Sequence, residues 1–252
     1  MNTQLVITTL IAATITMLAT GLGAVPFYFV PHLSSVWSRR GYALAAGVML
    51  AASVFDLIMP AVQRGGYGAA AVGLAVGSVV FWSSEIWLEG KDVQIGKIRG
   101  ASARRVLLIL GTLFIHSFPE GVAVGVGYGA QQGQSEQFGR LLALAISIQN
   151  IPEGLAVALP LRAENVPVTQ CVLWAIASSI PQPIAAIPAL ATVSFFEQLL
   201  PYTLAFAAGA MGFLVISELI PEGLEGKKER RLEMGAISVG GFLLLMISHV
   251  LM

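Results

Sequence analysis

The chain has 252 residues, of which 56% are hydrophobic and only 11% are charged. Soluble domains carry about 25% charged residues, so this composition excludes a disordered chain and argues strongly against a soluble domain. The 14 basic residues balance the 14 acidic ones, which gives no indication of a nucleic-acid partner. The single cysteine, Cys171, excludes an intramolecular disulfide and a multi-cysteine zinc site. The composition therefore predicts a multi-pass membrane protein surrounded by a lipid bilayer.

Long apolar runs define the predicted membrane spans, because a helix needs roughly 20 mostly apolar residues to cross a bilayer. The first run has no basic residue before it and is long, which predicts a mature helix rather than a signal peptide. We expect an all-α integral membrane protein with one transmembrane domain over residues 1–252. Its eight spans are predicted at about 5–29, 42–62, 67–88, 105–128, 140–161, 167–193, 201–221 and 232–252.

Basic residues near the span ends predict the orientation, because Lys and Arg accumulate in cytoplasmic loops. When alternate loops are assigned to two sides, all basic residues except Arg64 and Arg140 fall on one side. That side is predicted to be cytoplasmic, and it includes the longest loop, at about 89–104. With an even number of spans, both termini then lie outside. The absence of an organelle-type transit segment favours a bacterial inner membrane or a plasma membrane.

A six-residue motif occurs twice, 33 residues apart, in adjacent spans of opposite direction. The first copy, His-Ser-Phe-Pro-Glu-Gly, begins at His116, and the second, Gln-Asn-Ile-Pro-Glu-Gly, begins at Gln149. In each copy the first residue and the glutamate are four positions apart and share a helix face. If the two faces meet, His116, Glu120, Gln149 and Glu153 offer nitrogen and oxygen ligands to a divalent metal.

Four acidic residues lie inside the predicted spans, at Asp56, Glu120, Glu153 and Glu218. An ionised side chain at mid-bilayer costs several kcal/mol, so such residues are candidates for function. All Lys and Arg residues fall in predicted loops or at span ends, so we expect these acids to lack fixed cationic partners. They are then either protonated or neutralised by a mobile cation. A lone buried histidine usually serves as a hydrogen-bond partner, but the paired motif favours a metal site.

Proline and glycine accompany both glutamates. Pro119 and Pro152 each remove a helical hydrogen bond, which predicts a kink beside the ligands. Gly121 and Gly154 follow the glutamates and predict close approach of neighbouring helices. Such residues often serve packing alone in membrane helices.

A fainter repeat relates predicted spans two and seven. The segment Ala-Ala-Gly-Val-Met at 45–49 resembles Ala-Ala-Gly-Ala-Met at 207–211, at an offset of 162 residues. Seven residues after each methionine comes an acid, Asp56 or Glu218, followed by Leu-Ile. This pattern predicts that spans one to three and six to eight are inverted copies around a central pair, which is a transporter architecture.

Four weaker candidates complete the residue-level interpretation. Asn150 and Ser117 lie beside motif residues and could widen the site. Met49 offers a soft thioether ligand, although a single methionine in a membrane helix usually serves packing. Gln182 is an intramembrane amide between two prolines, and helix distortion explains the prolines but not the amide.

The paired motif resembles the signature of the ZIP (Zrt/Irt-like) divalent-metal transporters. The tail from Leu155 to Arg162, Leu-Ala-Val-Ala-Leu-Pro-Leu-Arg, resembles their GufA-like branch. The resemblance extends over all eight spans and implies both termini outside and a two-metal centre between spans four and five. It further implies movement of zinc, and often iron, manganese or cadmium, into the cytoplasm. It implies no prosthetic group, since the divalent metal is the substrate.

Carried over by motif position, the resemblance implies two metal sites. Relatives of this branch often have Asn at the position of Ser117 and an acid at the position of Gln182. This chain lacks that acid, so the second site would contain only two carboxylates. We therefore predict one well-occupied site and a weak or absent second one, with Asp56 near the outer mouth of the path and Glu218 near the inner mouth. The first site would use Met49, His116, Glu120, Gln149 and Glu153, with Asn150 at a position where many relatives have Asp; the second would use Ser117, Glu120, Asn150, Glu153 and Gln182.

These observations predict a transporter that works by alternating access rather than an enzyme. The alternatives are an intramembrane metalloenzyme and a metal sensor without flux. An enzyme would need an open coordination position and a general base, yet no His-Glu-x-x-His motif and no second intramembrane histidine accompany His116. Whether the chain forms a homodimer is left open.

Overall fold

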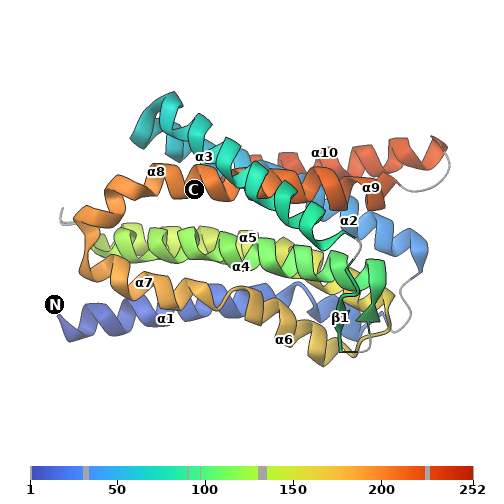
Figure 1. Ribbon diagram of the computed structural model, residues 1–252. Helices are drawn as coiled ribbons and strands as arrows, with labels where there is room; N and C mark the ends of the chain where they lie inside the picture. The colour runs from blue at the N-terminus through green and yellow to red at the C-terminus, as the bar shows by residue number, and fades with distance from the viewer. Residues whose placement is uncertain are drawn as a thin grey trace.

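The computed structural model describes residues 2–30, 34–89, 91–96, 98–129, 135–224 and 228–251. This part of the chain is helical almost throughout (Figure 1), which confirms the predicted all-α class. A two-stranded antiparallel hairpin, β1 (Gln94–Ile95) and β2 (Ile98–Arg99), is the exception, with Gln94 opposite Arg99. The helical elements are α1 (Thr3–Leu22), the 3-10 turn η1 (Val25–Tyr28), α2 (Ser35–Ala52), the π-helical segment η2 (Ser53–Ile58), α3 (Met59–Leu88), α4 (Gly100–Gly129), α5 (Ser135–Ala163), α6 (Val168–Ser178), α7 (Pro181–Ala191), α8 (Val193–Leu214), the π-helical segment η3 (Val215–Leu219), α9 (Ile220–Leu224) and α10 (Lys228–Leu251).

Six helical stretches of the described chain are long and apolar enough to cross a membrane, against the eight predicted. One of them, Ser35–Leu88, has 54 residues and contains predicted spans two and three. A straight helix of that length would measure about 80 Å, far more than the roughly 30 Å core of a bilayer. Gly66 interrupts it with φ 73° and ψ 174°, a conformation that favours glycine. The helix α10, which covers the eighth predicted span, is not among the six stretches.

Two further boundaries differ from the predicted ones. The loop expected at about 89–104 contains the β1–β2 hairpin, and α4 begins at Gly100, earlier than predicted. The sixth predicted span is divided into α6 and α7 at Ser179 and Ile180, directly before Pro181. Proline lacks the N–H that would continue the preceding helix, which explains the break.

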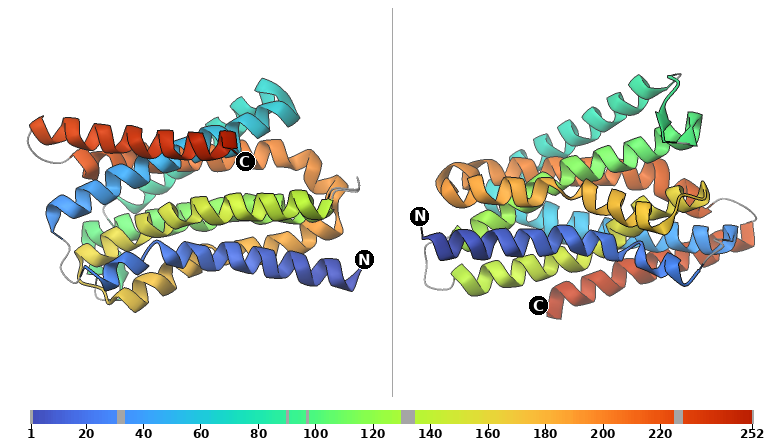
Figure 2. Two further views of the ribbon diagram at one scale, coloured as in Figure 1. Left: turned by 180° about the vertical axis from the view of Figure 1, so that it is seen from behind. Right: turned by 90° about the horizontal axis from the view of Figure 1, so that it is seen from below.

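The helices form two layers that lie against each other along their length (Figures 1 and 2). The first layer contains α2, α3, α8, α9 and α10, with α3 packed on α8 and α2 packed on α10. The second layer contains α1, α4, α5, α6 and α7, with α4 packed on α7 and α1 packed on α5. Contacts of α4 with α8 and of α2 with α5 join the layers. We call this junction the seam.

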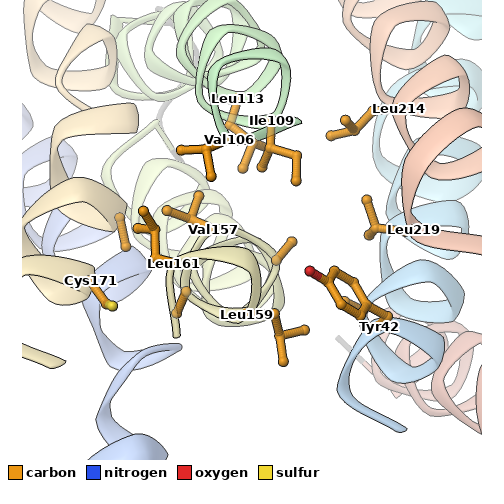
Figure 3. Packing of buried hydrophobic residues seen from close by; sticks show 14 of the residues in the cluster. Tyr42, Val106, Ile109, Leu113, Val157, Leu159, Leu161, Cys171, Leu214 and Leu219 are labelled. Atoms are coloured by element: carbon orange, nitrogen blue, oxygen red, sulfur yellow. The ribbon is translucent and has the colours of Figure 1, made fainter. Parts of the chain in front are cut away.

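An apolar cluster fills the seam at the end of the bundle where the hairpin lies. Figure 3 shows Ile109 and Leu113 of α4 and Val157 of α5 turned toward the space that Leu214 and Leu219 approach from the other layer. All five side chains are buried, and burying an aliphatic side chain contributes about 1.5–3 kcal/mol. The burial of these apolar side chains holds the two layers together at this end.

Glycines allow the helices to approach closely at several crossings. A Cβ atom added at Gly154 of α5 would overlap the backbone carbonyl of Thr20 in α1, and one added at Gly121 of α4 would overlap the backbone of Gln182 in α7. The predicted close approach at these two glycines is therefore confirmed. Between α8 and α3, a Cβ atom at Gly209 would overlap the carbonyl oxygen of Leu74.

The substitution Gly209→Ala tests this packing. Because the added methyl group meets backbone atoms that cannot rotate away, we expect a loss of about 1–3 kcal/mol in the free energy of unfolding. Gly212→Ala, on the same helix, is the matched control, since a Cβ atom there meets nothing within 4 Å. Thermal unfolding of both variants in detergent measures the difference. Equal melting temperatures for the two would contradict the close α3–α8 packing.

Candidate metal centre

Three metal-ligating side chains meet between α4 and α5. His116 Nε2 lies 3.5 Å from Glu120 Oε1 on the same helix and 3.3 Å from Glu153 Oε1 on the facing helix. Their side chains are at most 2% exposed, and one ligand atom from each lies within 4.8 Å of the other two. The structure therefore brings together the imidazole and both carboxylates of the paired motif.

The spacing of these atoms suits a zinc-sized ion. Tetrahedral zinc binds nitrogen and oxygen at about 2.0–2.2 Å, which places neighbouring ligand atoms about 3.3–3.6 Å apart. Neither oxygen of Glu153 and neither ring nitrogen of His116 has a hydrogen-bond partner among the described residues. Buried polar groups without partners are costly, so an ion between them would satisfy atoms that the protein leaves open.

Glu120 is held differently from Glu153. Gln149 Nε2 donates to Glu120 Oε1 at 2.7 Å, and Gln182 Nε2 donates to Glu120 Oε2 at 2.6 Å. Gln149 comes from α5 and Gln182 from the first turn of α7, so three helices converge on one carboxylate. Gln149 therefore contacts Glu120 through its nitrogen, and its role as a metal ligand through the amide oxygen stays a prediction.

The predicted second-site residues form a buried polar network beside the first site. Asn150 Nδ2 donates to the carbonyl oxygen of Thr16 at 2.8 Å and lies 3.3 Å from Gln182 Oε1. Its own Oδ1 atom has no partner in the described chain. Ser117 Oγ lies 3.5 Å from Ser179 Oγ. These contacts tie the predicted second-site residues to α1 and to the break between α6 and α7.

Two hydroxyl groups that the sequence pattern does not single out complete this network. Thr20 Oγ1 and Ser179 Oγ lie 2.7 Å apart, and both residues are fully buried. Threonine and serine commonly bond to their own helix backbone, so nothing distinguished them in the sequence. The offset of 162 residues between Thr20 and Gln182, equal to that of the fainter repeat, is the signal that could have drawn attention to Thr20.

Pro119 and Pro152 do not interrupt their helices. Both α4 and α5 continue through the prolines to Gly129 and Ala163. The predicted kinks are therefore too small to end the helix, and the ligands at i and i+4 stay on one helical face. The metal centre is built on continuous helices rather than on loops.

Met49 is not part of the group formed by His116, Glu120 and Glu153. It is buried in the apolar cluster with Leu113, Val157 and Met211. No described contact joins its sulfur to the imidazole or to the carboxylates, so its role as a metal ligand stays a prediction. Its present environment is that of a packing residue.

Glu218 corrects one expectation from the sequence. Arg105 Nε donates to Glu218 Oε2 at 3.0 Å, and Arg105 Nη2 lies 2.7 Å from Glu222 Oε1. Glu218 thus has a fixed cationic partner, and the expectation that all four acids lack one is wrong. Arg105 was counted at a span end, but α4 begins at Gly100 and carries Arg105 within its second turn.

Asp56 and Glu218 share an unusual backbone. Asp56 lies in η2 and Glu218 lies in η3, the two π-helical segments of the described chain. π-helical turns inside α-helices occur frequently at functional sites. Glu218 also lines a cavity of about 420 Å³ together with Glu85, Glu89 and Arg104. The roles of both acids on a metal path stay predictions.

Comparisons with known proteins agree on one family. The model of the ZIP zinc transporter family matches residues 89–248. Zinc transporter GufA of Myxococcus xanthus is 32% identical over 94% of this chain and 96% of its own length. Zinc transporter ZIPB of Bordetella bronchiseptica is 36% identical over 90% of this chain and 76% of its own length.

A third relative is much longer. A protein of Arabidopsis thaliana is 41% identical over 82% of this chain, but the match spans only 33% of the Arabidopsis protein. The metal centre, the helical membrane architecture and these matches lead to the same conclusion. The chain belongs to the ZIP zinc transporter family.

Proposed function

We propose that this protein carries divalent transition-metal cations, zinc above all, across a membrane into the cytoplasm by alternating access. The observation that carries the proposal is the buried triad of His116, Glu120 and Glu153, in which Glu153 has no hydrogen-bond partner among the described residues. The names of the bacterial relatives, both zinc transporters, support zinc. Imidazole with carboxylates also suits iron and cadmium better than it suits magnesium.

The proposed topology has eight spans, with the centre between spans four and five and both termini outside the cytoplasm. The break at Gly66 supports two passes within Ser35–Leu88, and α2 and α3 run in opposite directions in Figure 1. The helix α10 would be the eighth span. The hairpin end would face the cytoplasm in a bacterial inner membrane or a plasma membrane, because Arg39, Arg40 and Arg99 lie there.

Packing supports an inverted repeat of spans one to three and six to eight. In such a repeat α1 corresponds to α6 and α7, α2 to α8, α3 to α10, and α4 to α5. The packed pair α2–α10 then corresponds to the pair α8–α3. In the same way, the pair α1–α5 corresponds to the pair α7–α4. All four pairs are packed together. The glycine contacts correspond as well. Thr20 lies beside Gly154 and Gln182 lies beside Gly121. Thr20 and Gln182 are 162 residues apart, which is the offset of the fainter repeat.

The metal path would run from the mouth near Asp56 through the centre and past Glu218. Apolar clusters lie on both sides of the centre, with Leu113 and Val157 toward the hairpin end and Val122 and Val126 toward the other. This arrangement resembles a closed intermediate in which the site opens to neither side. Sliding along the seam would open one side at a time.

The competing functions receive less support. A metalloenzyme needs a metal-bound water and a general base beside an opening for substrate. Here the ligand side chains are at most 2% exposed, which leaves no entrance for a substrate larger than an ion. A sensor without flux has no need of acids at both predicted mouths. Transmembrane flux separates transport from both alternatives.

Zinc entry into proteoliposomes tests the proposed function. We expect saturable flux for the unmodified protein. In Glu153→Ala and in His116→Ala we expect the flux to fall more than roughly tenfold, because each variant loses a metal ligand. The loss of one ligand should weaken the binding free energy of the metal by more than about 1.4 kcal/mol, which corresponds to tenfold in affinity. A zinc-sensitive dye inside the vesicles measures the rate. Glu164→Ala, at an exposed position at the end of the same helix, is the control and should keep full flux.

The outcomes separate the candidate functions. Metal binding without flux, lost in both site variants, would favour a sensor or an enzyme. Flux that persists in both variants would place the path in other helices.

Metal stoichiometry tests the prediction of one well-occupied site. Two dications beside only two carboxylates would be under-neutralised at this depth, so we expect about one zinc per chain. Gln182→Glu keeps the shape of the side chain and adds a charge, and it should raise the stoichiometry toward two. Mass spectrometry of metal bound after gel filtration measures this ratio. Gln170→Glu, at an exposed position, is the control. Two zinc ions in the unmodified protein would contradict the prediction.

External pH should affect uptake through competition for the same atoms. Histidine and carboxylate ligands bind metal only when deprotonated, so protons compete with zinc. We expect the initial rate of zinc uptake to fall as external pH is lowered from about 7.5 to about 5.5. Protein-free vesicles with a zinc ionophore correct for changes in zinc speciation. Faster uptake at low pH would replace simple competition with a protonation-driven step.

A further inference from the structure

An apolar groove opens on the outer surface of the seam, away from the metal centre. It lies between η1 and α5 of one layer and α2 and α10 of the other, and its volume is about 410 Å³. Natural small-molecule pockets measure roughly 300–1,000 Å³. Leu44 in its wall is 40% exposed, so the groove opens to the exterior. The apolar part of the wall includes Phe27, Gly41, Leu44, Leu155, Leu159 and Ile237.

Glycine at position 41 hollows this groove. The atoms nearest to a Cβ atom there belong to the side-chain end of Leu159, at 2.9 Å and beyond. Any larger residue at this position would therefore project into the space between α2 and α5. The groove runs along α2 from Arg40 past Gly41 to Leu44, which lies one helical turn deeper.

One end of the groove carries aromatic and basic groups. Trp37 is 60% exposed, and the guanidinium carbon of Arg40 lies 5.2 Å from the centre of its ring. Arg40 Nε donates to Glu233 Oε1 at 2.9 Å, and Nη2 donates to the same oxygen. A guanidinium has five donor hydrogens, so Arg40 keeps donors for a second acceptor. Tryptophan and arginine in this arrangement are typical of the level of lipid headgroups.

We infer that this groove binds an anionic phospholipid of the cytoplasmic leaflet. Arg40 would donate to the headgroup phosphate, since arginine forms strong charge-assisted hydrogen bonds with phosphate oxygens. One acyl chain would follow Gly41 and Leu44 into the apolar space between α2 and α5. The inference uses the membrane orientation proposed above, with the hairpin end in the cytoplasm, but it does not depend on metal transport.

The place of the groove gives the lipid a structural role. Its two walls belong to different layers, so the acyl chain would contact both sides of the seam at once. Any sliding of the layers against each other would change the shape of the groove. The bound lipid would therefore favour the arrangement of the layers in which the groove is open.

Native mass spectrometry of the full chain, released from nanodiscs with equal amounts of phosphatidylglycerol and phosphatidylcholine, tests the inference. Both lipids carry the phosphate, but the quaternary ammonium of phosphatidylcholine offsets its charge, so we expect the unmodified protein to retain phosphatidylglycerol about tenfold over phosphatidylcholine. Arg40→Gln should abolish this preference while leaving total lipid retention nearly unchanged. Leu44→Trp should reduce retention of both lipids, because the indole fills the groove. Gly41→Leu fills it from the adjacent turn and serves as a second variant.

Two matched substitutions control for general effects. Leu144→Trp changes an exposed leucine of α5 outside the groove, and Arg64→Gln removes an arginine beside another cavity. Neither should alter lipid retention. Equal retention of the two lipids by the unmodified protein, or unchanged retention in both groove-filling variants, would overturn the inference. A dimer that Leu44→Trp converts to monomer would also overturn it, because the groove would then be an interface between copies. Zinc flux is measured separately, so either result leaves the test of transport intact.

Discussion

The constraint on which this structure depends is the burial of two carboxylates and one imidazole between α4 and α5. A buried charge is tolerated only when other groups or an ion compensate it, and within the described chain the centre contains no Lys or Arg. The protein supplies partial compensation to Glu120 through the amides of Gln149 and Gln182. Among the described residues, no amide donates a hydrogen bond to Glu153. The close glycine crossings follow from the same need, because polar atoms of α1 and α7 can reach the centre only if the helices nearly touch.

Arg105 shows what a fixed cation does instead. Its guanidinium joins Glu218 and Glu222 near the hairpin end, and all three side chains are partly exposed, Glu218 least at 13%. A permanent arginine in the centre would satisfy the carboxylates and remove the advantage of binding a mobile ion. At the hairpin end the same pairing would compete with a metal leaving the protein. A fixed cation at the hairpin end and none in the described part of the centre is the arrangement that the proposed path requires, with tight binding inside and weak binding at the proposed exit.

Sequence reasoning identified the centre because its signal is local and repeated. The i, i+4 spacing puts each pair of residues on one helix face, so the four side chains come together once the faces of these two neighbouring helices meet. The predicted all-α membrane class follows from composition and from the long apolar runs. The hydroxyls of Thr20 and Ser179 could not be identified, because their role depends on which helices touch α4 and α5. The partner of Glu218 could not be identified for a related reason, since the predicted span begins at Arg105, whereas α4 begins at Gly100 and carries Arg105 inside the helix. The eight predicted spans and the six long apolar stretches differ for two reasons: Ser35–Leu88 counts as one stretch although Gly66 interrupts it, and α10 is not among the six.

The proposed repeat also explains why the two glutamates differ. Gly121 admits the backbone of Gln182 on one side of the centre, and Gly154 admits that of Thr20 on the other. The two equivalent positions, Gln182 and Thr20, carry side chains of different length. The long amide of Gln182 extends to Glu120, whereas the short hydroxyl of Thr20 bonds to Ser179. An exact copy would have given each carboxylate an amide partner and reduced the demand of both for a cation. The replacement of an amide by a hydroxyl on one side leaves Glu153 beside the His116 imidazole but without an amide donor, and therefore as the carboxylate with most to gain from the proposed ion.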